Sequence, residues 1–247
     1  MAIGLRVRNQ GTGQVQIGAG YRNLQLAKSG TLDTGSFQGS STGGSPPFAS
    51  SSNYGLLERT AGTTKLHVVR YINDSVAFIT GFSIVQSGLS CYVFAANNAP
   101  NKTLEYYTFD ATERAASGPV GLRMRGEDGS VFYDSRRKGL RVLQVVPLPQ
   151  PPVNTPFVEV GQFFPGTKIG IAIPSPRFYY ASISQDRCTA YADAFHMTSD
   201  NRVFMSKHET FSQTLITNTF PVGGVTMGPQ NATIFIVDLT EVPLGFG

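Results

Sequence analysis

Isoleucine alternates with small residues in the segment Ile169-Gly170-Ile171-Ala172-Ile173. A period of two is typical of a β-strand with one strongly apolar face. A second segment, Ile234-Phe235-Ile236-Val237, is apolar at every position, as expected for a strand buried on both faces. Apolar residues do not recur at helical spacing over three turns anywhere in the sequence. The sequence therefore predicts an all-β protein.

The composition supports the same fold class. The 247 residues include 27 Gly and 15 Pro, and only 15% are charged, against roughly 25% in an average protein. This composition is unlike that of a helical bundle or coiled coil. A hydrophobic content of 40% excludes a disordered chain. The net charge of +4 comes without a long basic run, so we expect no nucleic-acid partner.

The ends and the cysteines indicate where the protein is made. Residues 1–10 lack the basic start, apolar run and cleavage site of a signal peptide. No stretch reaches the ~18 apolar residues that span a bilayer. Cys91 and Cys188 lie far apart and form neither a disulfide framework nor a zinc spacing. We expect synthesis in a cytoplasm, no membrane insertion, and two free, buried thiols.

Three further segments have recognisable patterns. Two β-rich runs flank Gly88 and predict a hairpin, Phe82-Ser83-Ile84-Val85 and Cys91-Tyr92-Val93-Phe94. Residues 35–53 are rich in Gly and Ser and predict a long surface loop. The alternative is an arm that orders against a neighbouring subunit, with Phe37 and Phe48 as anchors. The Pro-rich residues 146–152 predict an extended, rigid connector.

An internal repeat divides the chain. The motif Gly4-Leu5-Arg6-Val7-Arg8 recurs as Gly121-Leu122-Arg123-Met124-Arg125, and Leu24-Gln25-Leu26 recurs as Leu140-Arg141-Val142. In both copies a Gly-containing turn follows the Gly-Leu-Arg motif, and this turn predicts a hairpin. Fainter matches continue in the same order: Thr64-Lys65-Leu66-His67-Val68 with Thr167-Lys168-Ile169-Gly170-Ile171, the segments that begin at Cys91 and Cys188, and Tyr107-Thr108-Phe109-Asp110 with Phe235-Ile236-Val237-Asp238.

The repeat predicts two tandem antiparallel modules, each like a β-sandwich or jelly roll and related by duplication. The first module comprises residues 1–117 and contains the Gly/Ser-rich loop 35–53. The second comprises residues 118–247 and contains the Pro-rich segment 146–152.

A set of motifs surrounds the start of the second copy: Tyr106-Tyr107-Thr108-Phe109-Asp110, Gly121-Leu122-Arg123-Met124-Arg125, Gly129, Phe132-Tyr133-Asp134-Ser135 and Leu140-Arg141-Val142. This set resembles a family of bacteriophage tail proteins, whose members open with a similar Gly-Leu-Arg-Val segment. The first copy departs from the pattern, because Ile17-Gly18-Ala19 stands in place of Tyr133-Asp134-Ser135. The resemblance implies a structural component of the virion, at the distal end of the tail, that contacts other phage tail proteins.

Few residues could carry chemistry. Neither His67, in an expected strand, nor His196 has a partner at metal-ligand spacing. His208 and Glu209 could form an acid–base pair, but we interpret them as part of a solvated turn. The basic turn Ser135-Arg136-Arg137-Lys138-Gly139 is also interpreted as solvated, with an ionic contact to an acidic neighbour or an anionic polysaccharide as the alternative. We expect no catalytic, cofactor-binding or metal-ligating residues and no cofactor.

Three functions from different classes remain open. The first is a non-enzymatic structural subunit of a tail tip or baseplate, and the second is a receptor-binding module that contacts a host surface glycan or protein. The third is a polysaccharide depolymerase, which would need carboxylates that converge in space. We favour the first, as a homo-oligomer that forms a trimer or larger ring, because closed assembly covers exposed strand edges.

Overall fold

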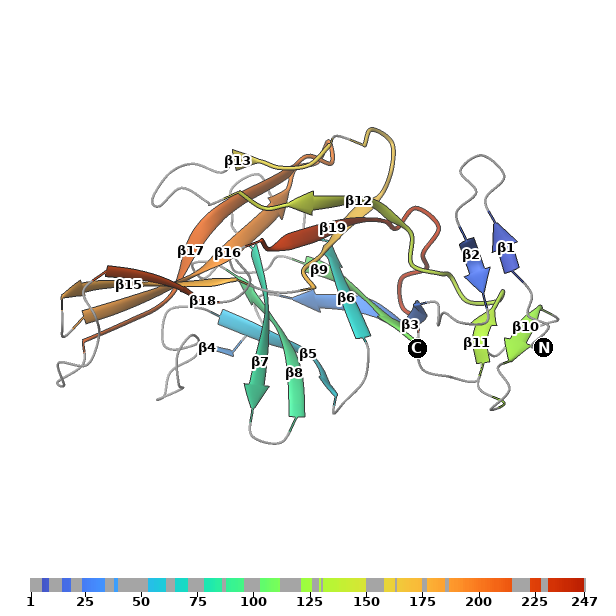
Figure 1. Cartoon of the computed structure of the whole chain (residues 1–247), viewed down its shortest axis with the longest axis horizontal. Helices are drawn as coiled ribbons and strands as arrows, with labels where there is room; N and C mark the ends of the chain where they lie inside the picture. Colours follow the sequence, from blue (N-terminus) through green and yellow to red (C-terminus); the bar gives the residue numbers. More distant parts are fainter. Residues whose placement is uncertain are drawn as a thin grey trace.

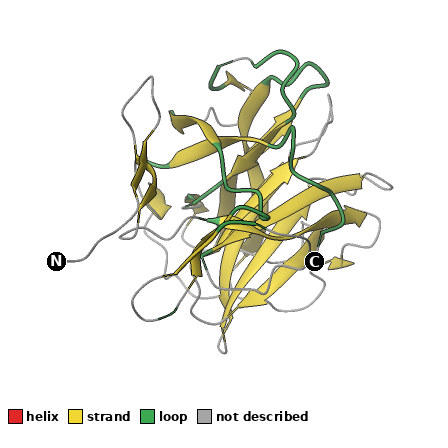
Figure 2. Cartoon of the chain, turned by 90° about the vertical axis from the view of Figure 1, so that its right-hand side faces the viewer, coloured by secondary structure: helices red, strands yellow, loops and turns green. Residues whose placement is uncertain are grey.

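The computed structural model describes the strands and many of the connections between them. The described residues are 6–8, 15–18, 24–33, 38–39, 53–60, 65–70, 78–85, 88–95, 103–111, 121–125, 129, 131–149, 158–162, 164–174, 177–184, 187–214, 223–227 and 231–246. Two large sheets make the body of the molecule, and two hairpins lie together at one end of it (Figure 1). Every described pairing is antiparallel, and no described residue is helical (Figure 2). The prediction of an all-β protein is confirmed.

A six-stranded sheet forms the centre of the molecule. Its strand order is β12-β19-β14-β6-β9-β3. The strands are β3 (Gln25–Asp33), β6 (Lys65–Arg70), β9 (Thr103–Asp110), β12 (Val142–Pro147), β14 (Ile169–Ala172) and β19 (Thr233–Asp238). All four residues of β14 are buried, and β19 is buried or half-buried along its whole length. Both strands therefore lie where their apolar sequences predict.

A nine-stranded sheet covers one face of the first. Its main order is β13-β17-β16-β7-β8-β5-β4, and β15 pairs with both β16 and β18. The strands are β4 (Gln38–Gly39), β5 (Asn53–Thr60), β7 (Phe78–Val85), β8 (Gly88–Ala95), β13 (Val158–Glu159), β15 (Phe178–Ser184), β16 (Arg187–Met197), β17 (Val203–Thr214) and β18 (Gly223–Met227). The expected hairpin is confirmed, because β7 and β8 pair directly from Val85 and Gly88 onward.

The main core lies between the two sheets. Isoleucines of β14 and β19 pack there against residues of β16 and β17: Phe195, Met197, Val203 and Met205. The opposite face of the six-stranded sheet carries a second cluster, Leu26, Leu66, Val68, Tyr107, Phe109, Ala172, Val237 and Leu239. Neighbouring residues of a strand point to opposite faces, so one sheet can contribute to both clusters. The fold is β-sandwich-like.

The two small hairpins share one geometry. In the first, β1 (Arg6–Arg8) pairs with β2 (Val15–Gly18), and in the second, β10 (Arg123–Arg125) pairs with β11 (Val131–Asp134). Each ladder shifts register between the second and third residues of its first strand. The sequence repeat predicts hairpins at both places, and both are present.

The strand order of the six-stranded sheet is symmetric about its centre if the strands that the repeat matches are treated as equivalent. The repeat matches β3 with β12, β9 with β19 and β6 with β14, and β6 pairs with β14 at the centre. The nine-stranded sheet lacks such an order, because its halves meet at β7 and β16. Both sheets contain strands from each half of the chain, and the expected boundary near Ser117 lies outside the described residues. The duplication stays a prediction.

Several local expectations need correction. The segment 35–53 is not wholly a loop, because Gln38 and Gly39 pair with the start of β5; Phe37 and Phe48 lie outside the described residues. Val146 and Pro147 end β12, so the expected connector begins inside a strand. His208 and Glu209 lie in β17 and not in a turn.

Both cysteines lie in the nine-stranded sheet. Cys91 belongs to β8 and Cys188 to β16, and β7 separates these strands. The two cysteines therefore lie in one sheet, and not in a separate sheet for each half of the chain. Whether their thiols are free and buried stays a prediction, because their side chains lie outside the described part.

Candidate functional site

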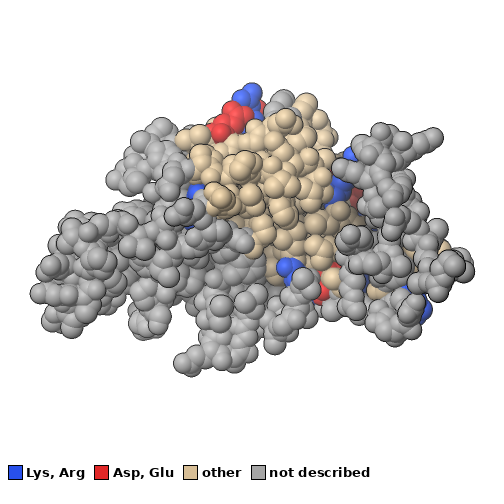
Figure 3. Space-filling view, viewed as in Figure 1, with Lys and Arg blue, Asp and Glu red and all other residues tan. Residues whose placement is uncertain are grey.

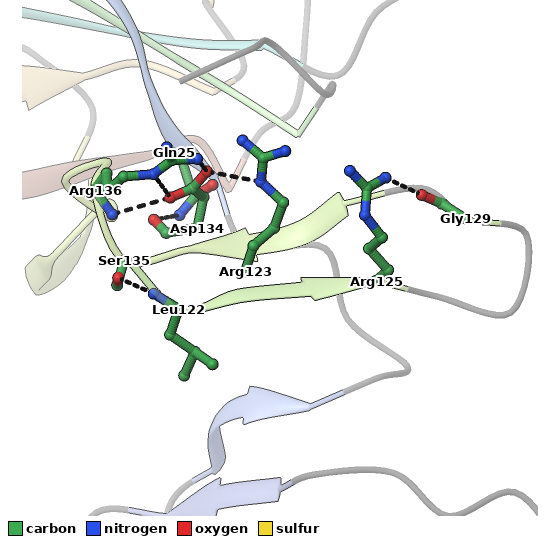
Figure 4. A network of polar contacts seen from close by, with 8 residues as sticks. All are labelled: Gln25, Leu122, Arg123, Arg125, Gly129, Asp134, Ser135 and Arg136. Atoms are coloured by element: carbon green, nitrogen blue, oxygen red, sulfur yellow. Dashed lines mark hydrogen bonds and ion pairs between the residues drawn. The ribbon is translucent and has the colours of Figure 1, made fainter. Parts of the chain in front are cut away.

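Asp134, from the motif that resembles tail proteins, lies at the end of β11 and is buried. Its carboxylate accepts hydrogen bonds from Nε of Arg123 at 3.2 Å and from Nε, Nη2 and the backbone N–H of Arg136 at 2.8, 2.5 and 3.1 Å (Figure 4). The hairpin places Arg123 directly across the ladder from Asp134, and Arg136 follows in the next turn. One carboxylate therefore holds two guanidinium groups.

These contacts fix the charge of Asp134. The hydrogen bonds from Arg136 lower the pKa of the carboxyl far below its ordinary value, although burial opposes the shift. The same contact raises the pKa of the Arg136 guanidinium. Both groups stay charged across the neutral range, so neither can exchange a proton in catalysis there. The site is suited to holding structure in place.

Asp134 also ties the hairpin to the six-stranded sheet. Its backbone carbonyl accepts a hydrogen bond from Nε2 of Gln25 in β3 at 2.8 Å (Figure 4). Ser135 closes the base of the hairpin, because its N–H donates to the carbonyl of Leu122 and its Oγ accepts from the N–H of Leu122, both at 2.9 Å. We call these four residues together with Arg123 and Arg136 the hairpin joint.

The turn that follows is bonded to the sheet as well. The N–H of Leu26 donates to the carbonyl of Lys138, and the N–H of Leu140 donates to the carbonyl of Leu24, both at 2.8 Å. Arg137 is buried. Residues 135–139 form a turn, as expected, and Ser135, Lys138 and Gly139 are exposed. The expectation of a fully solvated turn fails only at Arg137, because the backbone hydrogen bonds hold the turn against the edge of β3.

Basic side chains of this region pair within the chain. Lys138 lies 2.9 Å from Glu241, and Arg141 lies 2.9 Å from Asp238. Both acids follow or end β19. Lys138, Glu241 and Arg141 are exposed to solvent, so each pair contributes little to stability. They nevertheless show that the basic cluster has acidic partners inside the molecule, so its charge does not require an external anion.

Gly121 of the motif has a steric role in the joint. A Cβ atom added at this position would lie 2.5 Å from Cγ of Arg136 and 3.0 Å from Oγ of Ser135. Any larger residue would push the Arg136 side chain away from Asp134. The glycine therefore permits the close approach that the ion pair needs.

A second polar cluster joins three strands of the six-stranded sheet. The hydroxyl of Tyr107 in β9 donates to Oε2 of Glu105 at 2.7 Å, and Nζ of Lys168 donates to that hydroxyl at 2.8 Å. Lys168 also lies 2.8 Å from Glu105, and Nη1 of Arg70 in β6 donates to the carbonyl of Ile169 at 3.0 Å. The cluster therefore links β9 and β6 to the start of β14.

The cluster keeps fixed protonation states. Burial and the bond to Glu105 raise the pKa of the Tyr107 hydroxyl well above its ordinary value. Burial raises the pKa of Glu105, but the hydrogen bonds from Lys168 and Tyr107 outweigh burial and lower it overall. Tyr107 is therefore neutral and Glu105 charged at neutral pH, and neither of these two groups titrates near neutrality.

A third ionic contact lies inside the protein. Nε of Arg177 donates to Oδ2 of Asp193 in β16 at 3.0 Å, and Nη2 donates to Oδ1 at 3.3 Å. Nη2 also donates to the carbonyl of Pro149 at 2.8 Å. The pair fastens the segment after β12 to the nine-stranded sheet. Arg177 and Asp193 face each other at the end of the β15–β16 ladder, where the N–H of Asp193 donates to the carbonyl of Arg177 at 3.4 Å. No motif in the sequence signals this pairing.

The candidates for metal or acid–base chemistry do not converge in the described part of the chain. His67 is buried in β6, and its Nδ1 lies 3.1 Å from Oγ1 of Thr108. No group of three or more His, Cys, Asp or Glu side chains among the described residues is placed to hold a metal ion. The search of the same residues for a helix long and apolar enough to cross a membrane finds none.

Charges on the visible surface are scattered. On the face shown in Figure 3, the charged side chains of described residues lie around the margin of a broad uncharged area. One group combines both signs, because Arg202 contacts Glu159 at 3.2 Å and Asp200 at 3.1 Å. The described part of this face therefore offers no concentrated patch of one sign.

Comparison of this chain with protein-family models, with curated proteins and with solved structures finds no match. The assignment of a function therefore depends on the chain's own residues and on the resemblance of its motifs.

Proposed function

We propose that this chain is a non-enzymatic structural component of a bacteriophage tail, at the distal tip or baseplate. The observation that carries the proposal is the use of the motif residues. Asp134, Ser135 and Gly121 belong to the pattern that resembles tail proteins, and all three serve the hairpin joint. A motif of this kind preserves a structural element and not a reaction.

The polar clusters support a non-enzymatic role. Asp134 and Glu105 each contact basic side chains, and the pKa of Tyr107 lies far above neutrality. A general acid or base works best when its pKa lies near the operating pH. These groups instead hold strands and the hairpin together, as a structural subunit requires.

The protein functions as a homo-oligomer, a trimer or larger ring, in the virion and contacts other tail proteins. Free strand edges favour assembly, because an edge presents unpaired backbone donors and acceptors. Apart from Gln38 and Gly39, which pair with β5, the arm proposed for residues 35–53 would order against a neighbouring copy, with Phe37 and Phe48 as anchors. Ordering it costs roughly 1–2 kcal/mol per residue in backbone entropy and needs an extensive interface.

Immunogold labelling of purified virions tests the proposal. We expect label at the distal end of the tail and a closed oligomer in mild extracts of the particle. Absence of the chain from virions would exclude this function. A receptor-binding module, the second candidate, would instead make the purified protein compete with phage adsorption. Release of reducing sugar from host polysaccharide would indicate a depolymerase.

A further inference from the structure

Strands β3 and β12 lie at opposite edges of the six-stranded sheet and present the same ladder geometry. Strand β3 pairs with β9 and β12 pairs with β19, and each ladder shifts register by one residue, directly after Leu26 and directly after Val142. Ser29 stands three residues after Leu26, and Val145 stands three residues after Val142. Ser29 and Val145 therefore occupy equivalent edge positions.

The edge of β3 at Ser29 is covered by the end of the same chain. The N–H of Ser29 donates to the carbonyl of Phe246 at 2.8 Å, and the N–H of Phe246 donates to Oγ of Ser29 at 3.0 Å. Oγ of Ser29 in turn donates to the carbonyl of Pro243 at 2.7 Å. Ser29 is only 4% exposed beneath this cover, and Leu26, whose N–H donates to the carbonyl of Lys138, is 1% exposed.

In the described part of the chain, β12 pairs only with β19, and no strand pairs with its outer edge. Val142 is 39% exposed and Val145 is 54% exposed. The N–H of Leu148 donates to the carbonyl of Ala232, on the same ladder as β12 and β19. Hydrogen bonding alternates along an antiparallel strand, so Val145, three residues earlier, directs its N–H and carbonyl away from β19. Val145 therefore offers the same outward donor that Ser29 uses to bind Phe246.

We propose that the β12 edge between Val142 and Pro147 binds an extended segment of another polypeptide. A backbone carbonyl of the segment accepts a hydrogen bond from the N–H of Val145. An apolar side chain of the segment packs over Val142 and Val145. This is strand-edge recognition, in which backbone hydrogen bonds supply affinity and side chains supply specificity. The chemistry of the ligand is that of residues 243–246, Pro-Leu-Gly-Phe, which cover the equivalent edge of β3.

The size of the edge favours a single segment over a second copy of the sheet. Six residues of strand span about 20 Å, and a stable dimer buries about 800 Å² on each partner, more than one short edge provides. Pro147 has no N–H, so two β12 strands paired with each other would leave carbonyls without donors. The edge would bind such a segment whether or not the protein belongs to a tail.

A peptide titration of the full chain tests the proposal. The probe is a fluorescent peptide of residues 239–247, Leu-Thr-Glu-Val-Pro-Leu-Gly-Phe-Gly, followed by anisotropy. We expect saturable binding of one peptide per chain. Val145→Ser supplies the hydroxyl that Ser29 uses at the β3 edge, and should bind the peptide about threefold more tightly. Each hydrogen bond gained or lost changes affinity by roughly two- to tenfold.

Val145→Pro removes the outward N–H and should weaken binding at least about fivefold. Proline is tolerated at an edge position whose N–H faces solvent, so this variant should fold. Val145→Ile keeps the N–H and the branched, apolar Cβ and adds no hydroxyl, so it is the matched control, with binding within twofold of the original chain. Val145→Asp keeps the N–H but places a charge beside Val142, and should also weaken binding. It is the second test, for the case that Val145→Pro does not fold.

Two results would overturn the proposal. If Val145→Pro and Val145→Asp bind the peptide as tightly as the original chain, the peptide binds elsewhere. It could then replace residues 243–246 at the edge of β3. Absence of binding by both the original chain and Val145→Ser would show that the edge takes no such segment. If sedimentation shows self-association that Val145→Asp abolishes, β12 pairs with a second copy, and the assignment to another polypeptide is wrong.

Discussion

Arg177 and Asp193 form a two-pronged ion pair inside the protein, with both side chains almost wholly shielded from solvent. The same guanidinium binds the carbonyl of Pro149, so the pair connects the segment after β12 with β16. Removal of either charged group would therefore leave the charge of the other one buried without its ionic partner.

We expect Asp193→Ala to lower the free energy of unfolding by about 3–5 kcal/mol, because the Arg177 charge stays buried without its carboxylate. Urea denaturation measures the loss. Asp200→Ala, which removes an exposed carboxylate beside Arg202, is the control and should cost no more than about 1 kcal/mol. Equal losses in the two variants would contradict the structural role of the buried pair.

Acid should weaken the hairpin joint. The pKa of Asp134 is lowered in the folded protein by its bonds to Arg136, while an unfolded Asp has a pKa of about 3.9. The unfolded state therefore takes up the proton first, and stability supplied by Asp134 is present above that pKa and lost as pH falls below it. Urea midpoints measured from pH 7 down to pH 3 should show the loss.

Asp134→Asn should remove this part of the acid dependence and cost about 1–3 kcal/mol at neutral pH, because charge-assisted bonds to two arginines are lost. The matched control is Glu159→Gln, which alters an exposed ion pair with Arg202. An acid dependence of Asp134→Asn identical to that of the original chain would show that another group is responsible.

Gly121→Ala should destabilise the joint by about 1–3 kcal/mol, since its new methyl group would displace the Arg136 side chain. Gly139→Ala is the control, because a Cβ there would meet no atom within 4 Å. Thermal unfolding of both variants gives the comparison. A Gly121→Ala protein as stable as the original would mean that Arg136 can move without loss.

Tyr107→Phe should cost about 1 kcal/mol, the size of one net hydrogen bond. The loss is small because Lys168 still contacts Glu105 directly at 2.8 Å. Lys168→Met should cost more, since Glu105 would lose its nearest cation. A double-mutant cycle by urea denaturation separates the two contributions; full additivity would show that the Tyr107 hydroxyl and Lys168 act independently.

The amino-acid sequence by itself determined the strands. The patterns at Ile169–Ala172 and Ile234–Val237 reflect strands that are covered on both faces, because successive side chains of a strand point to opposite faces. The hairpins β1–β2 and β10–β11 were predictable from local sequence as well, because turn-forming residues separate their paired strands. The motif around Asp134 was visible too, but not its role in joining the hairpin to β3.

Only the tertiary structure decided which strands are neighbours and which charges meet. Arg177 reaches Asp193, Lys168 reaches Tyr107, and Gln25 reaches Asp134 across 16, 61 and 109 positions of sequence. Such pairs leave no local pattern, because a long-range contact depends on the order and register of strands that the whole core selects together. The same holds for the difference between Ser29 and Val145, because the Ser29 N–H is bonded to Phe246 whereas Val145 is 54% exposed.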